Sequence, residues 1–297
     1  MTGMAMEQQS ANTAVNTADN PRSLFTRLPL SGRIGAGIVA TVAVMAIVSV
    51  VWTPYDPIQV HPSERLAGSS WSHLFGTDRY GRDVFSQIMA GSRITLFIGL
   101  VAVAIAGLLG TPLGILAGMR RGWVETFVMR GADLILAFPA LLLAIVSGAV
   151  FGASTLSAMV AIGVAGIPAF ARVARAGTLQ VMSRDFVLAA RSAGITSPVI
   201  AVRHVLPNIT SILIVQASVA FALAILAEAA LSFLGLGTPP PDPSWGRMLQ
   251  TAQASLGVTP MLAVWPGVAI AVTVLGFNLL GDGLRDATDP KREVGRA

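Results

Sequence analysis

Cysteine is absent from this chain of 297 residues, histidine occurs three times and lysine once. Without cysteine, no disulfide and no thiolate metal site can form. His61, His73 and His204 are too widely separated to show the ligand spacing of a zinc site. No Gly-x-Ser-x-Gly segment marks a hydrolase nucleophile. We therefore expect no catalytic residue and no metal ligand in the chain.

The one lysine, Lys291, lies in the segment Asp-Pro-Lys-Arg with no glycine-rich loop before it. The phosphate-binding loop of ATPases requires Gly-x-x-x-x-Gly-Lys followed by Ser or Thr. That loop is therefore excluded, and any ATP that drives this protein must be hydrolysed by another polypeptide.

Charged residues make up 12% of the chain and hydrophobic residues 54%, whereas about 25% of the residues of a soluble domain are charged. Uncharged runs of about 18 residues or more predict membrane-spanning helices. Six are predicted, at 34–52, 94–119, 209–234 and 260–281, with two inside 134–171 that turn near 148–155. Pro139 and Pro168 predict kinks in the third and fourth of these helices.

The polar residues 1–33 are predicted to form a disordered cytoplasmic tail. No small-x-small cleavage site follows the first apolar run, so we interpret that run as an uncleaved span. Residues 34–285 then form one all-α membrane domain, and residues 286–297 form a second tail.

Basic residues are distributed unequally between the segments that link the spans. With the N-terminus inside, the inner segments hold fifteen of the 20 arginines and lysines, and the outer segments hold five. Positive charge accumulates on the cytoplasmic side of membrane proteins. The bias predicts that both termini and the loop 178–208 are cytoplasmic, and it explains the net charge of +5 without a nucleic-acid partner.

Within that loop, Ala189-Ala190, Gly194 and Leu206-Pro207 are separated by three and then eleven residues. Phe186, Ala189, Ala190 and Ala193 follow helical spacing, with Asp185 placed to cap the helix and Gly194 placed to end it. Ser197-Pro198 can begin another helix. The alanines predict either a surface that a partner's cleft approaches closely or a plain amphipathic loop helix.

The spacing of this loop resembles the cytoplasmic EAA loop by which permeases of ABC importers dock on an ATPase subunit, although Leu188 stands where that loop carries its glutamate. Three other segments are also distinctive: Phe-Gly-Thr-Asp-Arg-Tyr-Gly-Arg-Asp at 75–83, Glu-Ala-Ala-Leu-Ser-Phe-Leu-Gly-Leu-Gly at 228–237 followed by Pro-Ser-Trp-Gly at 243–246, and Phe-Asn-Leu-Leu-Gly-Asp-Gly-Leu-Arg-Asp at 277–286. Together they are similar to the second permease subunit of dipeptide, oligopeptide and nickel ABC importers, over most of residues 50–292.

The resemblance implies the all-α, six-span fold of type I ABC-importer permeases, in the inner membrane. It implies three kinds of partner: a homologous second permease, two subunits that bind ATP and Mg, and an extracytoplasmic substrate-binding protein. This chain itself would bind no cofactor. The residues implied in ATPase docking are Asp185, Phe186, Ala189, Ala190, Arg191, Gly194, Ile195, His204 and Pro207.

The implied cargo is a peptide, with nickel chelates or another small solute as the alternative. A secondary transporter is a second alternative, but it predicts a repeat and a charged site in mid-membrane. Neither is visible in the sequence, and a membrane enzyme would need the catalytic residues that are missing.

The outer-loop motif comprises Gly76, Thr77, Asp78, Gly81, Arg82 and Asp83. We expect Asp83 to cap a short interfacial helix that precedes the second span. The charges of Asp78, Arg79, Arg82 and Asp83 either fix the turn by internal ion pairs or contact a binding protein.

Charges within spans are candidate functional groups. Glu228 is predicted near the outer mouth, where it either meets a substrate ammonium or pairs with the proline-rich loop 238–245. Asp133 and Asp282 are predicted to pair with nearby arginines. Five glycines at 99, 107, 110, 114 and 118 pack the second span either against the partner permease or within this subunit.

Overall fold

The computed structural model describes residues 28–288, and in this range the chain is helical with no β-strand. The long elements are α3 (Leu30–Val51), α4 (Val84–Met119), α5 (Trp123–Ala137), α6 (Ala140–Phe151), α7 (Thr155–Met182), α10 (Leu206–Phe233) and α12 (Met261–Thr288). The short elements are η1 (Pro62–Glu64), α8 (Asp185–Ser192), α9 (Ser197–Ile200), η2 (Ala201–Val205), α11 (Trp245–Ala252) and η3 (Gln253–Ser255). The all-α prediction is confirmed.

Five helices are long and apolar enough to cross a membrane, and α5 with α6 makes a sixth span if this pair, bent by 79°, is counted as one. The bend follows from Pro139, which has no N–H to donate and restricts Phe138 to an extended backbone. The kink predicted at Pro139 is therefore confirmed. Pro168, in contrast, lies inside α7, which the structure assigns as one helix.

The predicted boundaries need correction at several ends. The first helix begins at Leu30, inside the predicted tail, and the last runs to Thr288. The expectation of a separate short interfacial helix after Asp83 is wrong, because the residues after Asp83 are continuous with the second span in the 36-residue α4. The fifth span begins at Ser197, since α9, η2 and α10 are continuous. The remaining tail residues, 1–27 and 289–297, lie outside the described residues.

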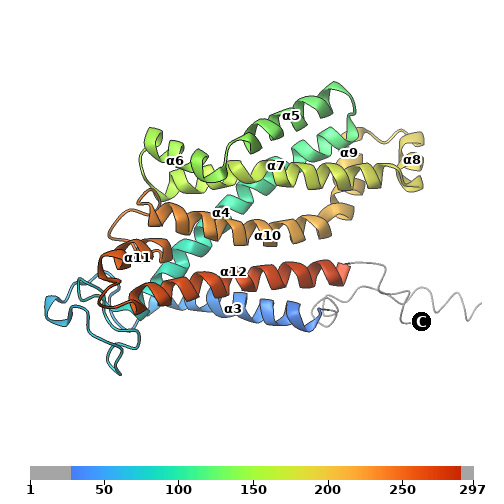
Figure 1. Ribbon diagram of the computed structural model, residues 1–297. Coiled ribbons are helices and arrows are strands. Elements are labelled where there is room, and N and C mark those ends of the chain that lie inside the picture. The colour runs from blue at the N-terminus through green and yellow to red at the C-terminus, as the bar shows by residue number, and fades with distance from the viewer. Residues whose placement is uncertain (1–27, 289–297) are drawn as a thin grey trace, which may run out of the picture.

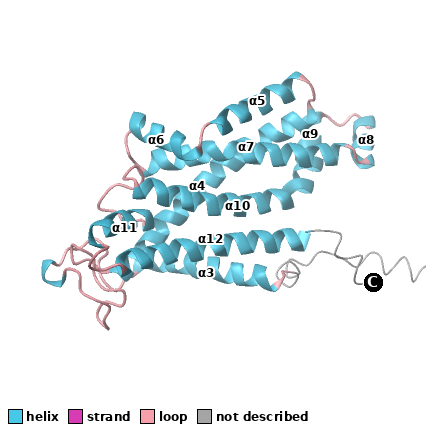
Figure 2. Ribbon diagram, viewed as in Figure 1, coloured by secondary structure: helices cyan, strands magenta, loops and turns pink. Residues whose placement is uncertain are grey.

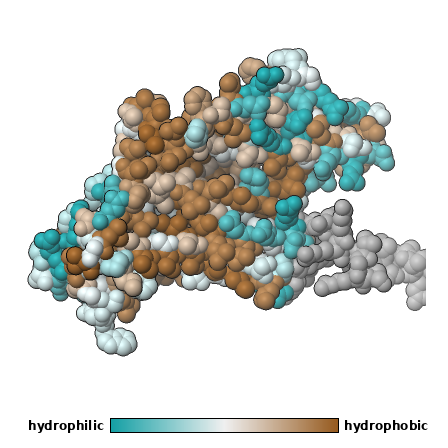
Figure 3. All heavy atoms as spheres, in the orientation of Figure 1, coloured by the Kyte–Doolittle hydropathy of each residue, from teal (hydrophilic) through white to brown (hydrophobic). Residues whose placement is uncertain are grey.

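The spans pack into one helical bundle (Figure 1). The helices α3 and α12 lie side by side, α10 packs on α12, and α4 crosses the bundle obliquely to pack along α7. The loops gather at the two ends (Figure 2). Hydrophobic residues form a broad band between more hydrophilic ends (Figure 3), as a bilayer requires. We call these ends the α8 end and the α11 end.

Glycines allow the close approach of α4 and α7. A Cβ atom on Gly110 would lie 2.6 Å from the carbonyl oxygen of Ile167, and one on Gly114 would overlap the carbonyl oxygen of Ala171. Gly118 faces Thr178 of α7 in the same way. These three glycines therefore pack α4 on α7 inside the subunit, which supports the second of the two predicted roles.

The first and last spans approach each other by the same means. A Cβ on Gly32 would lie 2.9 Å from the Cα of Gly283, and a Cβ on Gly276 would lie 2.6 Å from Cγ2 of Ile38. Small residues replace the hydrophobic effect as the basis of helix packing in lipid, because they let backbones touch. Here they join α3 to α12.

Replacing Gly114 by alanine is expected to destabilise the bundle, because the new methyl group meets backbone atoms that cannot move aside. Overpacking of this kind costs about 1–3 kcal/mol. Gly131 on α5 is the matched control, since a Cβ there meets nothing within 4 Å. The melting temperature of the full-length chain in detergent should fall for Gly114→Ala and not for Gly131→Ala. Equal melting temperatures in the two variants would contradict this account of the α4–α7 contact.

Candidate functional site

The predicted docking helix is α8, and its end is set by glycine. Gly194 has φ +76° and donates its N–H to the carbonyl of Arg191 at 3.0 Å, while the N–H of Ile195 reaches the carbonyl of Ala190 at 3.0 Å. This pair of hydrogen bonds is the Schellman motif, which requires a left-handed residue at this position. The predicted helix end at Gly194 is confirmed.

The start of α8 differs from the expectation. The capping position is occupied by Arg184, which makes no side-chain cap, and Asp185 is the first helical residue. Asp185 therefore does not cap the helix. Its carboxylate still lies in the first turn, where the helix dipole favours negative charge.

The two faces of α8 have different roles. Val187 is fully buried and Ala190 is 7% exposed, whereas Phe186 and Leu188 are 45% and 51% exposed. Ala189 and Arg191 are also exposed. Ala190 was predicted on the exposed face, and this is corrected: at i and i+3, Val187 and Ala190 point inward together. The outward face is therefore Phe186, Leu188 and Ala189.

The inward face of α8 joins the helix to the spans. Val187 packs in one cluster with Val205 of η2 and Ile209 of α10, and this cluster extends to Ile115 of α4 and Ala174 of α7. Through this cluster α8 is connected to the ends of three spans.

The segment that leads from α9 into α10 is a single π-helical turn. Pro207 has no N–H, so the usual hydrogen bond to the carbonyl of Arg203 cannot form. Instead, the N–H of Leu206 bonds the carbonyl of Ala201, and the Nδ2 of Asn208 donates to the carbonyl of His204 at 2.7 Å. The His204 ring lies 6.0 Å from the Phe186 ring, which adds a contact between α8 and the base of the fifth span.

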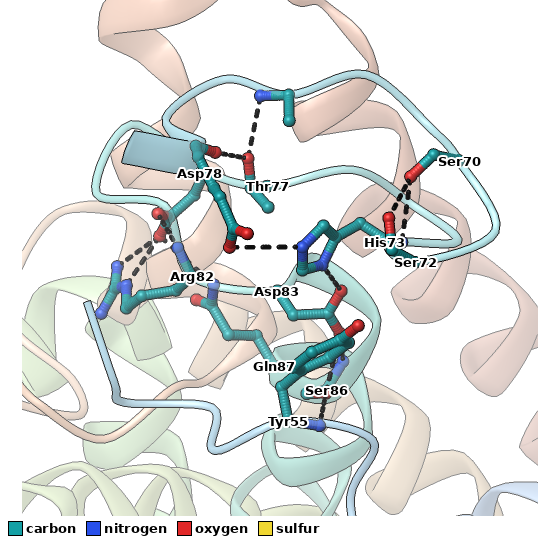
Figure 4. A network of polar contacts seen from close by, with 12 residues as sticks. Tyr55, Ser70, Ser72, His73, Thr77, Asp78, Arg82, Asp83, Ser86 and Gln87 are labelled. Carbon is teal, nitrogen blue, oxygen red and sulfur yellow. Dashed lines mark hydrogen bonds and ion pairs between the residues drawn. The ribbon is translucent and has the colours of Figure 1, made fainter. Parts of the chain in front are cut away.

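At the α11 end, the outer-loop motif folds on two aspartates (Figure 4). The Asp78 carboxylate accepts hydrogen bonds from Nε of Arg82 at 2.7 Å, from Nε2 of Gln87 at 3.2 Å and from the N–H of Tyr80 at 2.8 Å. The ion pair between Asp78 and Arg82 is internal to the loop. Gly81, with φ +81°, closes the turn where any Cβ would overlap the carbonyl of His61.

Asp83 caps α4 as predicted, but its partner is a histidine rather than an arginine. Its Oδ2 accepts hydrogen bonds from the N–H and the hydroxyl of Ser86, both at 2.7 Å, and its Oδ1 lies 2.9 Å from Nδ1 of His73. The Nε2 of His73 lies 3.5 Å from the Glu64 carboxylate. Sequence reasoning missed His73, because it lies in an irregular segment ten residues before the aspartate that it meets.

Glu228 is fully buried at the α11 end. Its Oε1 accepts a hydrogen bond from the Ser232 hydroxyl at 2.7 Å, and the Ser232 oxygen accepts one from the N–H of Thr238 at 3.1 Å. The hydroxyls of Thr95 and Ser244 flank the same carboxylate. In this conformation Glu228 has no route to a solute, so the geometry supports the pairing with the proline-rich loop.

The segment Pro-Ser-Trp-Gly holds α11 against the spans. Trp245 is fully buried, and its indole N–H donates to the carbonyl of Ile88 on α4 at 3.0 Å. Ser244 caps α11 by accepting from the N–H of Arg247 at 3.2 Å. Burial lowers the pKa of Arg247 from its ordinary value, and the nearby charges of Arg82 and Arg79 lower it further. The segments 75–83 and 228–246 therefore lie next to each other at the α11 end.

Of the ion pairs predicted for Asp133 and Asp282, only that of Asp133 is found in the described residues. Asp133 pairs with Arg172 of α7 at 2.6 Å, and Glu125 pairs with Arg175, so both contacts tie α5 to α7. Asp282 is exposed near the end of α12 and forms no ion pair within residues 28–288.

Replacing Asp83 by alanine should loosen the α11 end, because α4 loses its cap and His73 loses its buried partner. Loss of a cap alone costs about 1 kcal/mol. Asp56→Ala is the matched control, since the exposed Asp56 carboxylate accepts only the N–H of Ile58 in the described chain. Limited proteolysis of the segment 52–83 should be faster in Asp83→Ala and unchanged in the control. Equal cleavage rates would show that the cap is dispensable.

Comparison with known proteins places these features in a family. Residues 110–294 match the family described as the binding-protein-dependent transport system inner membrane component. The chain is 41% identical over 258 residues to the dipeptide transport system permease protein DppC of Alkalihalophilus pseudofirmus, covering 87% of this chain and 85% of that protein. It is 44% identical over 239 residues to the glutathione transport system permease protein GsiD of Pectobacterium atrosepticum, covering 80% of this chain and 79% of that protein.

The fold has a counterpart among solved structures. A chain of the methionine ABC transporter MetNI, in its inward facing conformations, superposes with a TM-score of 0.56 at 18% sequence identity, over 68% of this chain and 97% of that one. An identity this low supports a shared fold only. The family match and the relatives confirm the sequence-based prediction of a transport permease rather than an enzyme. The chain belongs to the family of binding-protein-dependent transport system inner membrane components and is a permease subunit of an ABC importer.

Proposed function

We propose that this chain forms one half of the membrane pathway of a peptide importer and that α8 is its contact with an ATPase subunit. The observation that carries the proposal is the two-faced α8, which exposes Phe186 and Leu188 while Val187 is buried in an apolar cluster that includes residues of α4, α7 and α10. A helix that is exposed on one side and packed into this cluster on the other can transmit the motion of a bound partner.

The charges support an orientation with the α8 end in the cytoplasm. This end carries Arg120, Arg121, Arg184, Arg191 and Arg203, all of them exposed or at the surface of short loops. At the α11 end, Arg82 is neutralised by Asp78. Positive charge favours the cytoplasmic side. In this orientation the outer-loop motif faces a substrate-binding protein, and both termini are cytoplasmic.

The remaining partners follow from the family. A second, homologous permease would complete the pathway, and two ATPase subunits would bind ATP and Mg, because the chain has no phosphate-binding loop. Relatives named as dipeptide and glutathione permeases favour a peptide cargo. The nickel-chelate alternative gains nothing from the structure, since residues 28–288 contain no cluster of three or more metal-binding side chains.

The cargo is tested by uptake. Deleting the gene for this chain from its host should abolish accumulation of a labelled dipeptide, and the wild-type gene should restore it. Excess unlabelled dipeptide or glutathione should compete with the label, and a nickel chelate should not. Unchanged dipeptide uptake in the deletion strain, with loss of nickel uptake, would move the assignment to the alternative cargo.

The docking role is tested by Gly194→Asp. The new side chain has space, but the left-handed φ strains any residue with a Cβ, and the carboxylate would lie on the partner surface. Gly152→Asp is the matched control: Gly152 also has a positive φ, +86°, and open space, but it lies at the end of α6.

Both variants should insert into the membrane, and only Gly194→Asp should lose the ATPase subunits on purification, with at least a tenfold loss of uptake. If Gly194→Asp retains the subunits and transports normally, α8 is not the docking element. If both variants fail equally, backbone strain rather than docking explains the defect.

A further inference from the structure

A cleft between the ends of α4 and α7 and the helix α8 is not used by the contacts described above. It has a volume of about 310 Å³ and is lined by Met119 of α4, Arg121 of the following turn, Leu179, Met182 and Ser183 of α7, and Arg191 of α8. Its lining therefore combines apolar side chains with two arginines.

The two arginines of the cleft are unpaired. Neither guanidinium forms an ion pair or hydrogen bond with any residue between 28 and 288. The neighbouring arginines of α7 behave differently, because Arg172 and Arg175 are paired with Asp133 and Glu125. No carboxylate lines the cleft, so it offers two positive charges to a ligand.

The cleft lies at the α8 end, beside the last turns of α4 and α7. The Ser183 hydroxyl is already bonded to the carbonyl of Gln180 at 2.8 Å. A small anion would contact the arginines alone and would leave Met119, Leu179 and Met182 uncovered. A ligand with an anionic group joined to hydrocarbon matches both kinds of lining side chain.

We propose that this cleft binds an anionic phospholipid, with the headgroup phosphate between Arg121 and Arg191 and the start of the acyl chains against Met119, Leu179 and Met182. Basic pockets between spans at the membrane surface suit such headgroups, and guanidinium binds phosphate through paired hydrogen bonds. Because Arg121 lies in the α4–α5 turn and Arg191 lies on α8, the headgroup joins α8 to the bundle and sets its orientation.

The test uses the assembled transporter, purified with its partner subunits and exchanged into nanodiscs. The probes are phosphatidylglycerol and phosphatidylcholine with identical acyl chains, and retained lipid is counted by native mass spectrometry. Wild type should retain phosphatidylglycerol in preference to phosphatidylcholine. Arg121→Gln and Arg191→Gln should each lower that retention about fivefold. Arg130→Gln, which removes an exposed arginine of α5 outside the cleft, should leave it unchanged.

Two further measurements separate the alternatives. Inorganic phosphate at millimolar concentration should not displace the lipid. Displacement would show that the cleft is a simple anion site. If Arg121→Gln loses ATPase subunits while it retains phosphatidylglycerol, the cleft is a protein contact and the lipid site is rejected. Equal retention in wild type and both cleft variants, each with an unchanged melting temperature, rejects it as well.

The effect on transport rests on the proposed docking role, whereas lipid retention does not. ATP hydrolysis by the complex should be higher in phosphatidylglycerol than in phosphatidylcholine, and Arg121→Gln should remove the difference. Lipid retention without this stimulation would keep the site and reject its action through α8. Failure of the Gly194→Asp test alone would leave the lipid site standing.

Discussion

The contact of α4 with α7, backbone against backbone, is the constraint on which the rest of the structure depends. Gly110 and Gly114 leave no room for a side chain against the carbonyls of Ile167 and Ala171. In lipid the hydrophobic effect does not drive helices together, so such close packing must supply the association. Because α4 spans 36 residues, it carries this constraint from its capped start at Asp83 to the arginines that follow Met119. Both ends of the bundle are therefore positioned by one helix.

The two ends use that rigid frame in opposite ways. At the α11 end, polar side chains are buried and paired: Asp83 with His73, Asp78 with Arg82, and Trp245 with the carbonyl of Ile88. A buried polar group without a partner is costly, so each pair holds its loop in one arrangement. At the α8 end, apolar and cationic side chains such as Phe186, Leu188 and Arg191 remain exposed. These pairs at the α11 end lie within the subunit, whereas the α8 end exposes side chains to partners, which agrees with the proposed docking surface.

The burial of Val187 explains how a helix of eight residues can serve as a mechanical link. An isolated helix of this length is unstable in water, and it needs tertiary packing to persist. The packing of Val187 with Val205 and Ile209 supplies that support and also connects α8 to the fifth span. The π-helical turn before Pro207 lies directly between the two, and such turns mark positions where a helix can change its course.

The sequence by itself determined what depends on neighbouring residues. The helix end at Gly194, the cap by Asp83 and the bend at Pro139 follow from local backbone chemistry, so all three were predictable. The apolar runs predicted six spans, and six are found when the bent pair α5–α6 is counted as one. The tertiary structure alone decided which side of an element faces which neighbour. Ala189 and Ala190 are adjacent and chemically identical, yet one is exposed and the other buried, because Val187 fixes the rotation of α8. Gly110, Gly114 and Gly118 of α4 face α7, and His73 meets Asp83 across an irregular loop, because these contacts arise from the path of the chain in space, which residue type and spacing do not specify.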